Sequence, residues 1–405
     1  MAGWAGLLCA ALVVWAAATW IPVLRPLRVP IAVAFAVRCV TALVHVYVAP
    51  LPDSSGDALG FEVRAWEWSR NGFVAALSRF ESGAFMYSWF GALLYSITGR
   101  SPLLLASANV LAGAMVAGVT GALAGELAGE RAARRTCWVV AFFPTLVLYS
   151  AMTVREAWII LFLVCGAFCA ARWQRGGGRI WIWVAVASLL AGSGLNSALL
   201  AATAVVVMEA LVHETHRFSE RPTTRAVLVL AGAACVVLCA AALAAAWGRE
   251  NLVWVIRPER FARVQMGFAT GRTAYLQGLY VDSPWDLLWQ TPIRAVVFLF
   301  GFPLPPETRM DVLAMLDALV YVALVVLIGW RMRVLWHDRA MRALLGTVVG
   351  VTLLFAIFTG NHGTALRHRA KVAPLAVALV AAAWAVTSPT PRRRTPRTEE
   401  SGSPG

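Results

Sequence analysis

At four points, this largely apolar sequence carries charged side chains whose types suit chemistry on a sugar hydroxyl or a phosphate. Asp57 is the first and lies in the stretch PLPDSSGDALG, on a turn leading into a helix that we expect near Ala58. A carboxylate at the mouth of a membrane-embedded site could accept the proton of a sugar hydroxyl. The alternative is that Asp57 caps the helix that follows it.

The pair Arg155-Glu156 is the second point and falls in a short turn between two apolar segments. Charges at such a place are costly unless they are solvated or used, which makes Glu156 a candidate second carboxylate and Arg155 a candidate substrate-binding residue. Alternatively, Glu156 is an acid favoured by the dipole at the start of a helix, and Arg155 lies at the membrane interface.

Basic residues mark the other two points. Because a guanidinium donates two hydrogen bonds at once to phosphate oxygens, arginines outside the apolar segments are candidate phosphate ligands. We therefore expect substrate binding by these residues of the two basic points: Arg257, Arg260, Arg367, His368 and Arg369. For Arg257 and Arg260 the alternatives are contact with anionic lipids or solvation, and for His368 solvation.

Composition excludes a water-soluble globule. Of the 405 residues, 60% are hydrophobic and only 14% are charged, with a mean hydropathy of +0.70. Apolar stretches recur along the chain and predict an all-α, polytopic integral membrane protein. The formal net charge of +14 is interleaved with these stretches, so it favours contact with membrane lipids and no nucleic acid.

We expect about eleven spanning helices, and residues 1–387 to form one membrane domain. The expected spans are 4–20, 31–48, 102–124, 137–150, 157–171, 180–193, 195–212, 226–247, 312–330, 343–358 and 372–387. Two shorter apolar pieces, 84–98 and 291–303, are expected to stay on the outer face as juxtamembrane or re-entrant helices. Residues 388–405, rich in Pro, Arg, Thr and Ser, are expected to be a disordered basic cytoplasmic tail.

Arginine placement predicts the orientation. Cytoplasmic loops are enriched in Lys and Arg, and an N-out, C-in chain with both short pieces outside puts most arginines of the short loops inside. The outer loops 50–101, 248–311 and 359–371 would then form the site. We expect the chain in the inner or plasma membrane of a bacterium.

Three stretches, within about residues 30–387, resemble the GT-C superfamily of membrane glycosyltransferases. The acidic first outer loop is followed by YSWFGALLYSITGRSPLLLASANVLAG, and FFPTLVLYSAMTVREAWIILF is similar to the family's second outer loop. GTALRHRAKVAPLA resembles the arginine-containing last outer loop of related polyprenyl-phosphate-sugar transferases and polysaccharide polymerases.

The resemblance implies transfer of a sugar from a polyprenyl phosphate or diphosphate donor to a glycan or lipid-linked acceptor, in cell-surface glycan synthesis. It implies Asp57 as general base, Glu156 as a second carboxylate, and Arg367 and Arg369 as the groups that neutralise the phosphate. The sequence differs from the family in three ways: Asp57 has no adjacent Glu, Phe61 stands where Tyr is common, and the span 4–20 is additional.

Other functions remain open from the sequence. A polymerase or ligase of O-antigen or exopolysaccharide units would depend chiefly on the arginines. A transporter or flippase would show inverted repeats and ionisable residues near the midplane, and a scaffold would need none of the four clusters. We assign no metal ligand and no certain cofactor, and a divalent cation at the acids stays open.

Overall fold

The computed structural model describes residues 1–218, 223, 271–279 and 283–386. The described chain is all-α, apart from an isolated bridge between Ala274 and Asn361. The expected span 226–247 and the tail 388–405 lie outside the described residues. The helices are α1 (Ala2–Trp20), α2 (Arg28–Tyr47), α3 (Leu59–Ser69), α4 (Phe73–Leu77), α5 (Met86–Thr98), α6 (Pro102–Ala128), α7 (Glu130–Phe142), α8 (Pro144–Ala151), α9 (Glu156–Gln174), α10 (Ile180–Ser193), α11 (Ala198–Phe218), α14 (Pro284–Phe300), α15 (Arg309–Trp330), α16 (Met332–His337), α17 (Arg339–Phe358) and α18 (His362–Val386).

Seven of the described helices are long and apolar enough to cross a membrane: α1, the Arg25–Tyr47 segment that contains α2, α6, α9, α15, α17 and α18. At 1.5 Å per residue, a helix of about 20 residues matches the hydrocarbon thickness of about 30 Å. Three further expected spans coincide with helices that are shorter or broken. Residues 137–150 are divided between α7 and α8, α10 has 14 residues, and the apolar part of α11 runs from Ala198 to Met208.

Helices α6, α9 and α18 form the centre of the bundle, since 72% of the apolar window of each is buried, against 28% for α1 and α15. Small residues let α6 approach its neighbours closely. A Cβ atom at Gly113 would lie 2.7 Å from Nε of Arg38. By contrast α1 exposes a stripe of large apolar side chains, Trp4, Leu8, Leu12 and Trp15, as expected of a helix at the lipid boundary.

Pro144 separates α7 from α8. Because proline has no N–H, the last turn of α7 cannot continue its hydrogen bonding into α8. Arg38 of α2, which is fully buried, donates from Nη1 to the carbonyl of Ala141 at 3.0 Å and from Nη2 to that of Val140 at 3.1 Å. The guanidinium thus donates to two carbonyls in the last turn of α7, of which that of Val140 also accepts from the N–H of Phe143 at 3.4 Å.

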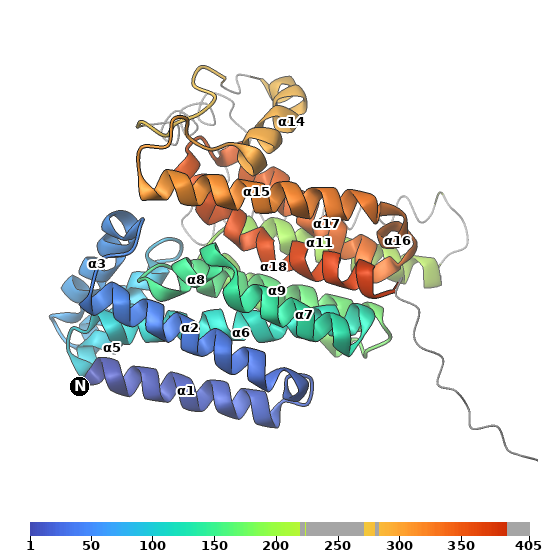
Figure 1. The fold of residues 1–405 in the computed structure, drawn as a ribbon. Coiled ribbons are helices and arrows are strands. Elements are labelled where there is room, and N and C mark those ends of the chain that lie inside the picture. Colours follow the sequence, from blue (N-terminus) through green and yellow to red (C-terminus); the bar gives the residue numbers. More distant parts are fainter. Residues whose placement is uncertain (219–222, 224–270, 280–282, 387–405) are drawn as a thin grey trace, which may run out of the picture.

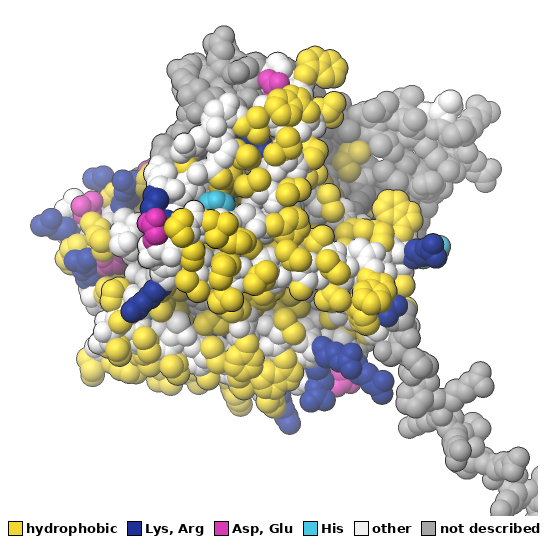
Figure 2. Space-filling view, turned by 45° about the horizontal axis from the view of Figure 1, so that its top comes forward, with side chains coloured by type: hydrophobic (Ala, Val, Ile, Leu, Met, Phe, Trp, Pro, Cys, Tyr) yellow, Lys and Arg dark blue, Asp and Glu magenta, His cyan; other side chains and the backbone are white. Residues whose placement is uncertain are grey.

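The helices place their connecting segments at two ends of the bundle (Figure 1). At the end that we call the site end, α2 and α8 terminate and α9 and α18 begin, with α3 and α5 beside them (Figure 1). At the opposite, arginine-rich end, Arg175 pairs with Asp338 at 2.7 Å and donates to the carbonyl of Leu127. Between the ends, apolar side chains cover most of the described surface seen in Figure 2.

Helix α5 begins and ends at the site end. Before its start, the N–H of Gly83 donates to the carbonyl of Gly194 at 2.6 Å, and after its end Arg100 pairs with Glu62 of α3 at 2.7 Å. Its 13 residues cover about 20 Å, which is less than the bilayer core. The juxtamembrane position of residues 84–98 stays a prediction.

Candidate functional site

Arg367, in the second turn of α18, is the centre of a group of charged side chains at the site end. Its guanidinium donates to both carboxylate oxygens of Asp53, from Nε to Oδ2 at 2.5 Å and from Nη2 to Oδ1 at 2.8 Å. Its third nitrogen, Nη1, contacts Oδ2 of Asp57. The Tyr149 hydroxyl also donates to Asp53 Oδ2, at 3.2 Å. We call Asp53, Asp57, Tyr149, Arg155, Glu156, Arg367 and Lys371 the Arg367 cluster.

The local backbone explains how two carboxylates reach one guanidinium. Asp53 adopts a left-handed conformation with φ of +68°, which aspartate tolerates better than most residues. Residues Ser54–Ala58 then form a single wide turn, interrupted at Gly56, before α3 begins at Leu59. Asp57 lies in that turn with its side chain 63% exposed, whereas the side chain of Asp53 is 19% exposed.

The turn between α8 and α9 is held by polar side chains from two other segments. The amide nitrogen of Asn109, on α6, donates to the carbonyls of Met152 and Val154, at 2.5 and 2.6 Å. Thr153 in turn donates to the carbonyl of Ala58 at 2.8 Å. These bonds fasten the turn both to the core and to the segment that carries Asp57.

Arg155 and Glu156 form the more buried part of the Arg367 cluster. Arg155 donates to the carbonyl of Leu195 at 2.5 Å, and burial lowers its pKa although Glu156 and Asp57 act in the opposite direction. Glu156 is 4% exposed, and its Oε1 lies 3.8 Å from Nζ of the buried Lys371. The structure therefore brings Arg155, Glu156 and Asp57 to the same end of the bundle as Arg367.

The expectation of an outer loop over residues 359–371 is wrong, because α18 begins at His362 and carries the basic residues within the helix. Arg367, Arg369 and Lys371 each find a carboxylate partner on another segment. Paired in this way, the charges can enter the bundle, and the helix continues through them.

Arg369 does not join the cluster, contrary to the expected role in phosphate binding. It is fully buried and pairs through Nε with Oδ2 of Asp317, on α15, at 3.0 Å. It also donates to the carbonyls of Leu299 and Gly301. On the helix Arg369 lies two residues from Arg367, which directs the two side chains to different neighbours. A guanidinium with these partners is unavailable to a ligand at the site end.

His368 is likewise engaged inside the protein. Its Nδ1 lies 2.9 Å from Oγ1 of Thr359, and its ring lies against that of Phe355, with centroids 4.5 Å apart. The structure thus gives His368 internal partners in place of the expected contact with substrate.

Arg257 and Arg260 lie outside the described residues. Residues 271–279, which follow them in the chain, are hydrogen-bonded beside the start of α18. The N–H of His362 donates to the carbonyl of Thr273 at 3.0 Å, and the N–H of Tyr275 donates to the carbonyl of Gly360 at 2.9 Å.

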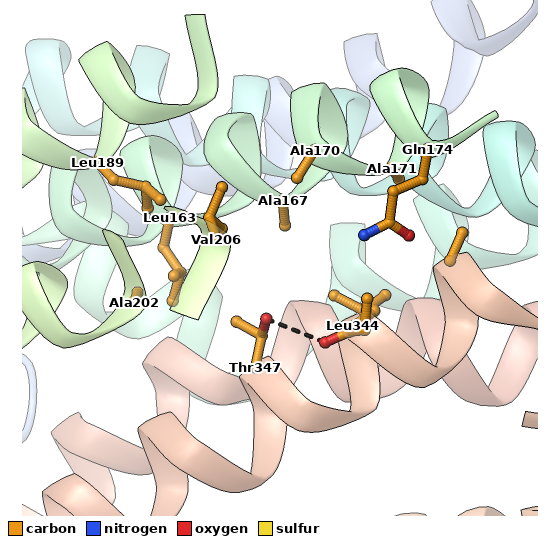
Figure 3. A pocket seen from close by; sticks show the side chains of 12 residues that line it. Leu163, Ala167, Ala170, Ala171, Gln174, Leu189, Ala202, Val206, Leu344 and Thr347 are labelled. Carbon is orange, nitrogen blue, oxygen red and sulfur yellow. Dashed lines mark hydrogen bonds between the residues drawn. The ribbon is translucent and has the colours of Figure 1, made fainter. Parts of the chain in front are cut away.

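A cavity lies between α9, α10, α11 and α17 (Figure 3). Its walls are mainly Leu, Ala and Val side chains, with Thr347 and Gln174 among them, and none of the expected site residues lines it. No group of three His, Cys, Asp or Glu side chains suited to a metal ion occurs within the described part of the chain.

The sequence analysis did not identify three residues of this site: Asp53, Tyr149, which donates a hydrogen bond to Asp53, and Asn109. For Asp53 a signal existed, because it stands four residues before Asp57 in the same Pro- and Ser-containing turn. For Asn109 the signal was an amide side chain within the long apolar segment of α6.

Comparison with known proteins gives no family for this chain: no family model, no curated protein and no solved structure matches it.

Proposed function

We propose that this protein transfers a sugar from a polyprenyl-(di)phosphate carrier to an acceptor at the extracytoplasmic membrane face. The observation that carries the proposal is the contact between Arg367 and Asp57. A group suited to hold a phosphate and an exposed carboxylate suited to accept a proton lie together at one end of a bundle of apolar helices.

The chemistry requires two functions at one point. The oxygen of the acceptor hydroxyl attacks the anomeric carbon of the donor sugar, and the bond between that carbon and the phosphate oxygen breaks. The electron pair of the broken bond leaves with the phosphate, whose charge Arg367 stabilises. Asp57 takes the proton of the hydroxyl as general base, a role worth about 100- to 10,000-fold in rate.

The position of the cluster suits a lipid-linked donor. Arg367 and Lys371 belong to the first turns of α18, a helix apolar enough to span the bilayer. A carrier whose isoprenoid chain stays among lipids would present its phosphate at this depth, and its sugar to the water beyond.

The distribution of arginines supports the extracytoplasmic side. The segments at the arginine-rich end and the helix termini beside them carry Arg25, Arg28, Arg131, Arg134, Arg135, Arg172, Arg175, Arg179, Arg331, Arg333, Arg339 and Arg342. By the positive-inside rule we infer that this end is cytoplasmic and that the Arg367 cluster faces the opposite side.

The test is the set of lipid-linked saccharides that accumulate when the gene is deleted, measured by mass spectrometry. We expect a polyprenyl-linked sugar to accumulate and wild-type protein to remove it, whereas Asp57→Asn and Arg367→Gln should not. Asp338→Asn is the matched control: it weakens an Arg–Asp pair at the other end, and asparagine still caps α17. A polymerase or ligase would instead lose activity in Arg367→Gln and keep it in Asp57→Asn. Normal saccharides in the deletion strain would exclude the proposed function.

A further inference from the structure

The two acids that share Arg367 hold it in different ways. Asp53 occupies two nitrogens of the guanidinium in a fork, and its own Oδ2 also accepts from Tyr149. Asp57 occupies only Nη1, and its side chain is 63% exposed against 19% for Asp53. A forked and partly buried carboxylate is held firmly, whereas a single exposed contact exchanges readily with water or another anion.

The backbone at Asp57 leaves room for such an exchange. The turn Ser54–Ala58 is interrupted at Gly56, whose φ of −91° and ψ of −111° are not helical. A Cβ atom at Gly56 would meet no other atom within 4 Å, so the neighbouring space is open. Ala58, by contrast, is buried, and its carbonyl accepts from Thr153. Asp57 can therefore leave Arg367 without disturbing the packing on either side.

We infer that Nη1 of Arg367 is an exchange position, held by the Asp57 carboxylate in this structure and taken by a phosphate oxygen of the donor. The inference rests on the proposed function and assigns the order of its steps. While Oδ2 of Asp57 accepts from Arg367, the contact holds the carboxylate at the guanidinium, so that it cannot turn toward an acceptor hydroxyl. Arrival of the phosphate frees it. The carboxylate can turn toward the acceptor hydroxyl once the leaving group is bound, which disfavours loss of the sugar to water.

The geometry supplies the reason why Asp53 does not exchange in the same way. It keeps Nε and Nη2 of Arg367 fixed, so the plane of the guanidinium and the direction of Nη1 stay constant through the exchange. Asp53 is thus a positioning residue.

Binding of farnesyl phosphate to the purified full-length protein, measured by calorimetry, tests the inference. If Asp57 competes with the phosphate for Arg367, Asp57→Ala should bind farnesyl phosphate more tightly than wild type, by about two- to fivefold for an exposed contact. Arg367→Gln should bind about tenfold more weakly or not at all. Asp338→Asn, the control at the other end, should bind as wild type does.

Hydrogen–deuterium exchange provides a second readout. Farnesyl phosphate should speed exchange of the amides of residues 54–58 in the wild type, because Asp57 is released, and should leave Asp57→Ala unchanged. Equal or weaker binding by Asp57→Ala, slower exchange of 54–58 on binding, or no binding by the wild type would each overturn the inference. If purified Asp57→Ala binds farnesyl phosphate more tightly than wild type while the deletion strain has normal lipid-linked saccharides, the exchange position is supported and sugar transfer is rejected.

Discussion

The guanidinium of Arg367 and the carboxylate of Asp53 form two parallel hydrogen bonds, at 2.5 and 2.8 Å, across 314 residues of sequence. This fork joins the segment after α2 to the start of α18. In the sequence, most of the chain lies between these two segments. The fork fixes the plane of the guanidinium, and with it the direction in which the remaining nitrogen points.

Replacement of Arg367 by lysine should reduce sugar transfer by about 100-fold, the cost typical of losing one stabilising donor. An ammonium carries the charge but cannot fork both oxygens of Asp53 while contacting a third group. The rate of transfer in membrane vesicles checks this, with the unfolding temperature measured alongside. Near wild-type transfer by Arg367→Lys would show that charge alone suffices and that the fork has no role.

Asp53→Asn and Asp57→Asn should separate structure from chemistry. Asp53 is partly buried and bonded to Arg367 and Tyr149, so we expect its variant to lose about 1–3 kcal/mol of stability. Asp57 is exposed, so its variant should unfold like wild type, within about 0.5 kcal/mol, while losing transfer. Denaturant unfolding in detergent compares the two. Equal destabilisation by both would mean that Asp57 is a structural partner of Arg367 like Asp53.

The pair Arg369–Asp317 should behave as a structural element. Removing one partner leaves a buried, uncompensated charge, so Arg369→Met or Asp317→Leu alone should cost about 3–5 kcal/mol. The double variant should recover much of that loss, because neither charge remains. The prediction is checked by unfolding all three variants. A stable, inactive Arg369→Met protein would return Arg369 to the role of substrate ligand.

Arg38→Met should destabilise the protein by about 3 kcal/mol, since the carbonyls of Val140 and Ala141 lose a charged donor in a buried place. Arg28→Gln, in the same helix but exposed, is the matched control and should unfold like wild type. Unfolding temperatures in detergent provide the measurement. Equal stability of the two variants would contradict the role we give to Arg38 at the break before Pro144.

Cysteines introduced at exposed positions should report the orientation. In intact cells an impermeant thiol reagent should label Ser78→Cys, near the site end, and should reach Arg131→Cys, at the arginine-rich end, only after permeabilisation. The opposite pattern would place the Arg367 cluster in the cytoplasm and remove the proposed extracytoplasmic reaction.

The apolar spans were predictable because each is long enough for its composition alone to indicate a membrane-spanning helix. Segments such as Pro102–Ala128 and Arg309–Trp330 coincide with long apolar stretches of the sequence. The break at Pro144 was also visible in the sequence, but its partner was not. Arg38 bonds to carbonyls about 100 residues away, a contact that no local pattern encodes.

Long-range pairing also explains why the candidate site could be predicted only in part. A cluster of like charges before an apolar segment predicted a substrate-binding outer loop at 359–371, yet these charges are neutralised by Asp53, Asp317 and Glu156 from three other segments. Sequence alone could not assign those partners. It could indicate that Asp57, Arg155, Glu156 and Arg367 belong to one end, since the alternation of spans sets the end at which each turn lies.

The bonds of Arg38 also constrain how the protein is made. Two of its acceptors, in the last turn of α7, are synthesised 102 and 103 residues later, so in a nascent chain the guanidinium has only the Ala34 carbonyl of its own helix while α3 to α6 are still emerging from the ribosome. A charge of this kind is costly in lipid. Helix α2 should therefore stay beside the insertion machinery until α7 arrives, and α2, α6 and α7 should enter the bilayer as a group.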